Sequence, residues 1–368
     1  MFRIPAFIVM VCCIAWFGHS NAASGADEVV TIYPAYGYQG DAGWVISVRL
    51  WVHERRSVAD AAARKLVANI DDVSVEEIRN FQSRAADFLA DSESREEVSL
   101  AFDRDPMKER IHLADSNGCT QKSDLNGLIE RTIMLTRERA DSLLKAQESP
   151  SGWLSLTVTS KGHSGTGRVR LIAPEGISVI SDIDDTIKVT EIPAGPQVVM
   201  RNTFLRDYKA APEMLARYHD WSDASFHYVS GGPWQMYGPL SEFLIDSKDG
   251  FPEGSFHMKS VRKNLFSTSS WRDLTDLITN GEQTFDHKVA QISVIMERFP
   301  RRRFILVGDS GEKDPEVYRA IKAKFPKQVQ EIWIRDIVND RERRADRLAG
   351  MHIIPAATVQ HGASEFEK

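Results

Sequence analysis

The chain has 368 residues, of which 42% are hydrophobic and 27% are charged, and its formal net charge at pH 7 is −6. This composition excludes a disordered chain, a collagen-like fibre and a small scaffold built on disulfides, and the length suggests about two domains. The mild acidity and the lack of a long basic segment argue against a protein that binds nucleic acid.

Residues 1–22 have the pattern of a secretory signal peptide. Arg3 supplies a positive start, residues 4–17 form an apolar run, and residues 20–22 offer small side chains for cleavage. The run is shorter than the roughly 20 residues that span a membrane; a buried N-terminal strand is the alternative interpretation. We therefore expect export, to the periplasm or the cell exterior, and a net charge of −7 once Arg3 is removed.

Cleavage would also remove Cys12 and Cys13 and leave Cys119 as the one cysteine of the mature chain. A single cysteine forms no internal disulfide, so the fold must be stabilised by its packed core. Because no second long apolar run follows, we expect a mature protein that is soluble or contacts a membrane only peripherally.

Residues 27–174 show mainly the period of β-strands. Apolar and polar residues alternate from Trp44 to Val52, which is typical of a strand with one buried face. We expect further strands at 98–102, 110–113, 128–135, 154–159 and 168–172, with turns at 123–127 and 161–167. Short strands at this spacing predict a small β-sandwich. Helical spacing of Ile78, Phe81 and Ala85 predicts a helical insertion at about 57–92.

From 175 to 338, short apolar strands alternate with helices, which predicts a three-layer α/β fold around a parallel sheet. The expected strands are 178–180, 226–229, 304–307 and 331–334, and the expected helices include 287–298 and 315–325. A C-terminal helix and tail should occupy 339–368. Chemistry in such folds collects beyond the carboxyl ends of the strands.

The first predicted strand of this region runs into Asp182, Asp184 and Asp185. Three carboxylates in four residues repel one another unless a cation neutralises them, and hard oxygen ligands suit Mg²⁺. A calcium loop of the EF-hand type is excluded, because the positions that should carry an acid, a glycine and a glutamate carry Thr186, Ile187 and Pro193. Asp185 is interpreted as a helix cap.

Three more motifs follow at strand or helix ends. Ser230-Gly231-Gly232 leaves a hydroxyl and open backbone N–H groups, which can bind a phosphate oxygen. Lys288 begins a predicted amphipathic helix, where a lysine is usually solvated. The strand 304–307 leads into Gly-Asp-Ser-Gly, which places Asp309, and further on Asp314, at the edge of the first acidic cluster.

Three other enzyme classes that share parts of these motifs do not fit the sequence. Gly-Asp-Ser-Gly also surrounds the nucleophile of trypsin-like proteases, but those are all-β and rich in disulfides. A lipase nucleophile elbow needs glycine where Glu312 stands. No Gly-x-x-x-x-Gly-Lys-Ser/Thr loop is present, which argues against an NTP-cleaving motor.

The order of acidic cluster, serine, lysine and acidic strand end resembles the haloacid-dehalogenase-like phosphatases. More closely, residues 179–188, 229–234, His287-Lys288 and 305–318 resemble the catalytic signature of the actin-patch-type (App1-like) phosphatidate phosphatases. The resemblance covers about residues 170–337. It implies a haloacid-dehalogenase-like domain with a minimal cap, and the β half is similar to the sandwich that precedes this domain in bacterial relatives. Ser230-Gly231-Gly232 departs mildly from the family's usual pattern.

The resemblance also implies the roles of the site residues. Asp182 would be the nucleophile that forms an aspartyl-phosphate, and Asp184 the general acid and base. Mg²⁺ would bind a carboxylate oxygen of Asp182, the backbone carbonyl of Asp184, and Asp309. The phosphoryl oxygens would contact the side chains or backbone of Thr186, Ser230, Gly231 and Lys288, and Asp314 would orient this group.

The sequence indicates the substrate less clearly than the chemistry of the site. Only about 40 residues separate Thr186 from Ser230, which is too few for a large closed cap. An apolar rim suited to a diacyl lipid and a set of ordinary core residues are equally good interpretations of Trp234, Met236, Tyr237, Phe266 and Trp271. Phosphatidate is the substrate that the resemblance implies. The alternatives are a soluble phosphomonoester or phosphoprotein, or a non-catalytic envelope binding protein with a degenerate phosphatase fold.

Overall fold

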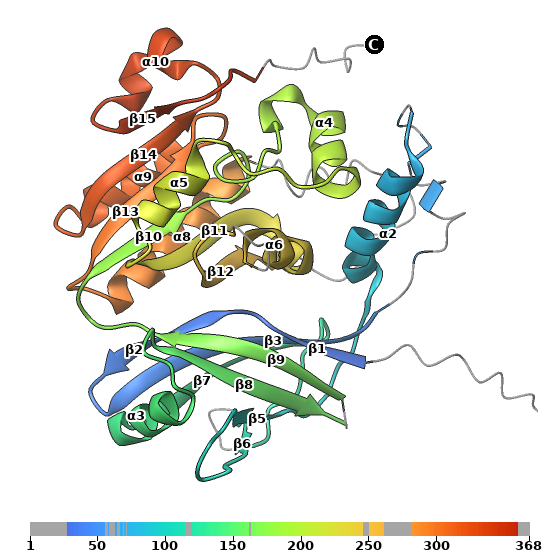
Figure 1. Ribbon diagram of the computed structural model, residues 1–368, viewed down its shortest axis with the longest axis vertical. Coiled ribbons are helices and arrows are strands. Elements are labelled where there is room, and N and C mark those ends of the chain that lie inside the picture. Colours follow the sequence, from blue (N-terminus) through green and yellow to red (C-terminus); the bar gives the residue numbers. More distant parts are fainter. Residues whose placement is uncertain are drawn as a thin grey trace, which may run out of the picture.

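A computed structural model describes residues 28–359, except 56–57, 59–62, 65–66, 69, 71, 115–118, 162, 246–249 and 261–280. The described residues form two sheets, a mainly antiparallel one in the N-terminal half and a parallel one in the C-terminal half (Figure 1). The predicted signal peptide lies outside the described residues. Among the helices that the structure describes, none combines the length and apolar character needed to cross a membrane.

The N-terminal half contains nine strands in one hydrogen-bonded sheet of order β1-β3-β2-β9-β8-β5-β6, with β4 and β7 also paired to β3. The strands are β1 (Glu28–Ile32), β2 (Ala35–Gly40), β3 (Gly43–Glu54), β4 (Asp91–Ser92), β5 (Ser99–Phe102), β6 (Ile111–His112), β7 (Leu128–Leu135), β8 (Trp153–Ser160) and β9 (His163–Leu171). Helix α3 (Arg137–Ala146) packs on the same core. The prediction of mainly β structure is confirmed. Two separate sheets are not seen, because the parallel β2–β9 pair joins the strands into one sheet.

The expected turn at 161–167 is shorter than predicted, because β8 ends at Ser160 and β9 already begins at His163. Its glycines are needed where β1 crosses the strand. A Cβ on Gly165 would lie 1.8 Å from the Val30 carbonyl oxygen, and one on Gly167 would lie 2.4 Å from the Ile32 side chain. These glycines therefore mark a close approach of two backbones and not a turn.

Helix α2 (Val75–Leu89) forms the expected helical insertion, although it is shorter than the predicted range. Ser74 and Glu77 form a reciprocal capping box at its start. Its buried face, which includes Ile78, Phe81 and Ala85, packs into the core of the C-terminal half. The N-terminal half thus contributes directly to the core of the other half.

The C-terminal half is an α/β structure with six parallel strands in the order β12-β11-β10-β13-β14-β15. The strands are β10 (Ile177–Ser181), β11 (Ser225–Pro233), β12 (Gly254–Lys259), β13 (Arg303–Asp309), β14 (Val329–Asp336) and β15 (His352–Pro355). Strand β15 was not predicted. It follows the short helix α10 (Asp340–Arg343) and occupies part of the region expected to be a helix and tail.

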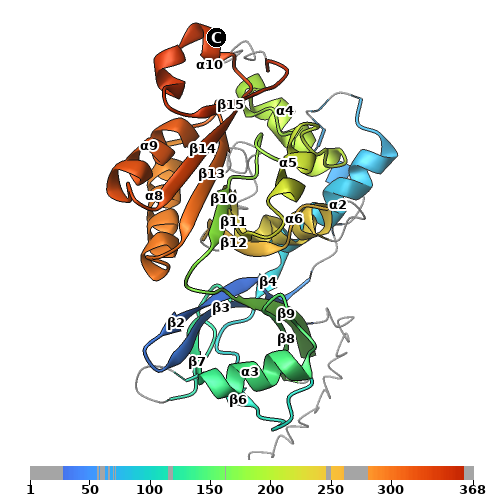
Figure 2. The same cartoon turned by 60° about the vertical axis from the view of Figure 1, so that its left-hand side comes forward.

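Helices cover both faces of this sheet, so the three-layer arrangement is present (Figure 2). Val179 and Phe226 face α4 (Pro196–Met200), α5 (Met214–Asp220) and α6 (Tyr237–Leu244). Ile180 and Leu306 face α8 (Gly281–Arg298) and α9 (Asp314–Lys324). Since α8 begins at Gly281, Lys288 lies inside this helix and not at its start.

A buried arginine fixes the link between the two halves. The guanidinium of Arg302 donates to the carbonyl oxygens of Ala173, Glu175 and Ile177, and its Nε donates to the Ser178 hydroxyl at 2.9 Å. A buried arginine is stable only when its donors are satisfied. The segment that leads into β10 is therefore held in one conformation.

We predict that Arg302→Ala lowers the free energy of unfolding by about 2–4 kcal/mol, because the buried Ser178 hydroxyl and three carbonyl oxygens lose their donor. Arg301→Ala is the matched control. Its side chain is 63% exposed and pairs only with the exposed Glu175, so we expect a loss of about 0.5 kcal/mol or less. Urea unfolding of the full chain measures both values, and equal losses would contradict the interpretation.

Candidate active site

The predicted site residues meet at the carboxyl ends of β10, β11 and β13. The parallel register pairs Ser181 with Tyr228 on one side and with Val307 on the other, which brings the three strand ends together. Asp182 follows β10 directly, Ser230 lies in β11, and Asp309 is the last residue of β13. Lys288 reaches the same place from α8.

Asp182 is 1% exposed and is held by two neighbours. Its Oδ2 accepts a hydrogen bond from the Thr186 hydroxyl at 3.0 Å, and its Oδ1 lies 2.8 Å from Lys288 Nζ. Thr186 was predicted to lie near the phosphate, and in the structure its side chain orients Asp182.

Lys288 is surrounded by three carboxylates. Its Nζ lies 2.6 Å from Asp314 Oδ1, 2.8 Å from Asp182 Oδ1 and 3.2 Å from Glu312 Oε2. Burial would lower the pKa of Lys288, but the three acids outweigh burial and raise this pKa well above its ordinary value. Lys288 is therefore a permanent cation inside the site.

Asp314 is fully buried and connects two parts of the site. One oxygen pairs with Lys288, and the other accepts a hydrogen bond from the backbone N–H of Asp309 at 3.2 Å. This position fits the predicted orienting role. Glu312 was not among the predicted site residues; it directly follows the Gly-Asp-Ser-Gly motif and was used only to exclude a lipase.

Carboxylate oxygens of Asp182, Asp309 and Glu312 lie within 4.8 Å of one another and can hold a metal ion. Asp309 Oδ1 accepts from the backbone N–H groups of Gly311 and Glu312, whereas its buried Oδ2 has no hydrogen-bond partner. Burial, with the charges of Asp314 and Glu312, raises the pKa of Asp309 well above its usual range. A buried oxygen without a partner beside other acids is what a cation would satisfy, so these residues fit a hard divalent metal.

Asp184 occupies a separate charged centre. Its Oδ1 accepts from Thr190 at 2.7 Å and pairs with the buried Lys188 at 2.8 Å, while its Oδ2 lies 3.5 Å from the Ser230 hydroxyl. Burial acts to raise the pKa of Asp184, but Lys188 and the two hydrogen bonds outweigh burial and lower it. No role was predicted for Lys188, because the residues around a single lysine in the sequence do not indicate whether it is buried or solvated.

Asp185 caps a loop and not a helix. It has a positive φ of 56°, and its carboxylate accepts from the backbone N–H groups of Thr190, Glu191 and Ile192. Arg335, from β14, donates to its carbonyl oxygen at 2.8 Å. Asp185 therefore shapes the chain after Asp184.

Ser230 and Gly231, two of the predicted phosphate contacts, lie near the carboxyl end of β11. The Ser230 hydroxyl accepts from the backbone N–H of Gly232 at 2.9 Å. A Cβ on Gly231 would lie 2.8 Å from the Thr284 side chain, so this position has no room for a larger residue. The roles of these two residues stay predictions.

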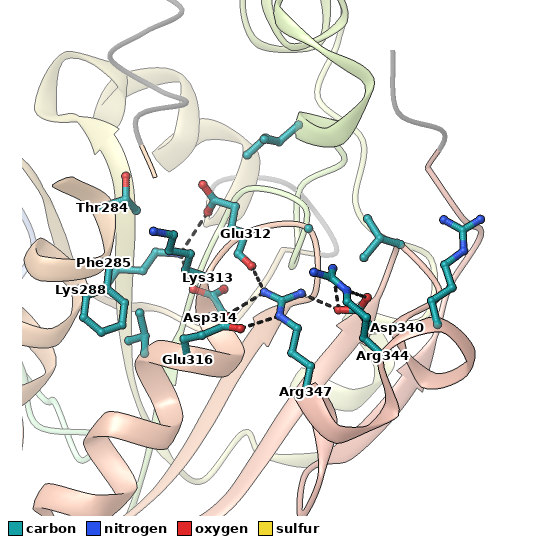
Figure 3. Close-up of a pocket in the computed structure, with 15 residues that line it drawn as sticks. Thr284, Phe285, Lys288, Glu312, Lys313, Asp314, Glu316, Asp340, Arg344 and Arg347 are labelled. Carbon is teal, nitrogen blue, oxygen red and sulfur yellow. Dashed lines mark hydrogen bonds and ion pairs between the residues drawn. The ribbon is translucent and has the colours of Figure 1, made fainter. Parts of the chain in front are cut away.

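A pocket of about 980 Å³ adjoins Lys288, Glu312 and Asp314. Figure 3 shows these residues on one side and the ion pairs of Arg347 with Glu316 and Asp340 on the other. Apolar side chains also line the pocket, namely Ile192, Phe285, Val317 and Val338. It thus offers a charged end and an apolar wall.

Of the two interpretations of the apolar residues near Ser230, a lipid rim or a core, the described residues support the core. Trp234 and Met236 are buried core residues, and Tyr237 packs against the same core. The Trp234 ring lies 4.3 Å from that of Tyr33, so it belongs to the contact between the two halves. Phe266 and Trp271 lie outside the described residues.

The fold and the site together define an α/β protein with a buried carboxylate–lysine centre at the ends of parallel strands. Residues 177–336 match the sequence model of the phosphatidate phosphatase APP1 catalytic domain. This part of the chain is therefore similar to the APP1 catalytic domain.

Two relatives match over about half of this chain. Phosphatidate phosphatase APP1 of Saccharomyces cerevisiae is 34% identical over 191 residues, which cover 50% of this chain and 30% of that protein. An uncharacterised protein of Schizosaccharomyces pombe is 29% identical over 180 residues, which cover 47% and 27%. The matched region thus spans less than a third of either relative.

A solved structure, of a carbohydrate acetylesterase from Xanthomonas citri, is 12% identical and aligns with 86% of this chain and 65% of that chain. Its TM-score is 0.27, which is too low to inform the fold or the function.

We predict that a divalent cation such as Mg²⁺ raises the melting temperature of the protein, because it binds the folded site and not the unfolded chain. Asp309→Asn should abolish this shift, whereas Asp223→Asn, an exposed carboxylate far along the chain from these acids, should keep it. Thermal unfolding with EDTA and with added metal measures the effect. An equal shift in both variants would contradict the assigned metal group.

Proposed function

We propose that this protein is a Mg²⁺-dependent phosphomonoesterase with a haloacid-dehalogenase-like fold, acting through an aspartyl-phosphate. The observation that carries the proposal is the buried Asp182, oriented by Thr186 and paired with Lys288, beside the acids Asp309 and Glu312. The family match of residues 177–336 supports it. The α/β sheet, with these groups at its carboxyl edge, supports the fold.

In the first step, a carboxylate oxygen of Asp182 attacks phosphorus. The new bond joins this oxygen to phosphorus, and the bond from phosphorus to the substrate oxygen breaks. In the second step, water attacks the same phosphorus and releases inorganic phosphate and free Asp182. Two easier displacements thus replace one difficult displacement.

Asp184 moves the protons. It donates a proton to the leaving alkoxide and later takes one from the attacking water. Its Oδ1 is held by Lys188 and Thr190, which leaves Oδ2, on the Ser230 side, for proton transfer. A bound phosphate is a negative charge near this carboxylate and raises its pKa, so substrate binding itself favours the acid form.

The phosphoryl oxygens would lie between Lys288, the Ser230 hydroxyl and the backbone of Gly231. Fixed donors aimed at developing negative charge are a main source of transition-state stabilisation. Asp182, Asp309 and Glu312 would hold Mg²⁺, which when bound neutralises negative charge on the phosphate.

Phosphatidate is the proposed substrate. The yeast relative bears this activity in its name, and the pocket beside Lys288 has an apolar wall as well as a charged end. That combination suits a phosphomonoester with an apolar body. We also propose export by residues 1–22, on the strength of their charged start, apolar run and small cleavage residues.

We predict that Asp182→Asn reduces phosphate release by about a thousandfold or more, because the amide neither attacks phosphorus nor completes the metal group. Initial rates with Mg²⁺ measure the loss, and circular dichroism checks the fold. Full activity in a folded Asp182→Asn variant would refute the aspartyl-phosphate mechanism.

The substrate class has its own test. We expect faster phosphate release from phosphatidate in detergent micelles than from small soluble phosphomonoesters, because only the lipid can occupy the apolar wall of the pocket. Phosphate release, compared at equal substrate concentration, measures this preference. Activity on soluble phosphomonoesters or phosphopeptides without micelle activity would reject the lipid substrate and keep the phosphatase.

A further inference from the structure

Helix α2 of the N-terminal half contacts a segment that follows the loop at 183–190, which holds Asp184 and is called the catalytic loop below. The contact is with η2 (Arg201–Leu205), a π-helical turn that follows α4. Figures 1 and 2 show α2 beside α4 although the two helices are far apart in the sequence. No described residue of α2 belongs to the predicted set of site residues.

Two side chains of α2 hold the end of this turn. Arg84 Nη1 donates to the carbonyl oxygens of Thr203, at 3.2 Å, and of Arg206. The Asn80 amide donates to the Leu205 carbonyl oxygen at 2.8 Å. The last carbonyls of a helical turn lack partners within the turn, so donors from a neighbouring helix fix their position.

The same arginine contacts an aromatic ring beside the catalytic loop. Arg84 Cζ lies 4.0 Å from the centre of the Tyr208 ring, and Lys188 Nζ lies 4.9 Å from the same centre. The Tyr208 hydroxyl is buried without a hydrogen-bond partner. The ring and not the hydroxyl therefore makes the polar contacts of this residue, as in a cation–π interaction.

Lys188 contacts both Tyr208 and Asp184. It is 1% exposed, and its Nζ lies 2.8 Å from Asp184 Oδ1 and 2.5 Å from the Thr190 hydroxyl. The backbone of this segment pairs with the segment that follows Tyr208, through the bridge between Lys188 and Ala210 and a 2.8 Å hydrogen bond from Val189 to Lys209. A shift of the Tyr208 segment would therefore move Lys188 and the carboxylate it holds.

We propose that Arg84 is a positioning residue for Asp184, acting through Tyr208 and Lys188. The proposal rests on the proposed function, in which Asp184 transfers the proton. It gives the N-terminal half a role in catalysis: its helix α2 holds the catalytic loop in the conformation that aims Asp184 at the substrate. A displacement of about 1 Å in a reacting group can cost a large factor in rate.

The test compares Arg84→Ala with Arg79→Ala in the full chain. Arg79 is exposed on the same helix. We expect Arg84→Ala to lower kcat about tenfold with KM within about twofold, because the phosphate contacts remain while Asp184 is misplaced. Arg79→Ala should have the same kcat and KM as the wild type. Millimolar guanidinium should restore part of the kcat of Arg84→Ala only, since it refills the vacated position over Tyr208.

A second pair of variants tests whether the Tyr208 ring links Arg84 to Lys188. Tyr208→Phe keeps the face that Arg84 and Lys188 contact, and Tyr208→Leu removes it. We therefore expect Tyr208→Phe to retain clearly more kcat than Tyr208→Leu. Equal losses in the two variants would exclude the ring as the link and overturn the proposed chain of contacts.

Hydrogen–deuterium exchange separates this proposal from the proposed function, because it needs no activity. Peptides that cover 183–190 should exchange faster in Arg84→Ala than in Arg79→Ala, with peptides from β8 and β9 unchanged. If the wild type shows no phosphatase activity, the proposed function fails and exchange alone decides whether Arg84 orders the loop. Unchanged exchange and kcat in Arg84→Ala, or faster exchange throughout the chain, would overturn the proposal.

Discussion

The arrangement of the site depends on one buried lysine. Lys288 reaches from α8 to Asp182 after β10, to Glu312 in the loop after β13, and to Asp314 at the start of α9. Leaving an acid or a lysine buried without its partner costs several kcal/mol. The helix, the two strand ends and the following loop are therefore fixed relative to one another by the same charge that would bind the phosphate.

A second buried lysine, Lys188, gives Asp184 a different electrostatic environment from that of Asp182. Burial raises the pKa of Asp182, whereas Lys188 and Thr190 lower that of Asp184. A metal ion beside Asp182 favours its charged form, and a phosphate beside Asp184 favours the protonated form. A bound metal and a bound phosphate would thus oppose these two pKa shifts, in the direction that the proposed reaction requires.

The two halves of the chain share one core. Trp51 of β3 and Tyr33, between β1 and β2, pack in this core with Trp234 and Phe204 of the α/β half. Ile78 and Phe81 of α2 belong to the same core. This explains why the aromatic residues near Ser230 were ambiguous in the sequence: they are apolar because they fill that contact. An N-terminal half packed so closely is well placed to influence the loop that holds Asp184.

The sequence by itself determined the α/β rhythm and the strand ends that carry Asp182, Ser230 and Asp309, because periodicity and polar motifs are local properties of the chain. It also pointed to Lys288 and Asp314 through the order of the motifs. Only the tertiary structure decided that Glu312 joins the acids, that Lys188 is buried against Asp184, and that Arg84 reaches the same loop from the other half. The meeting of Glu312 with Asp182, the burial of Lys188 and the reach of Arg84 all depend on how distant segments pack. A charged side chain has the same local signature whether it is solvated or buried with a partner.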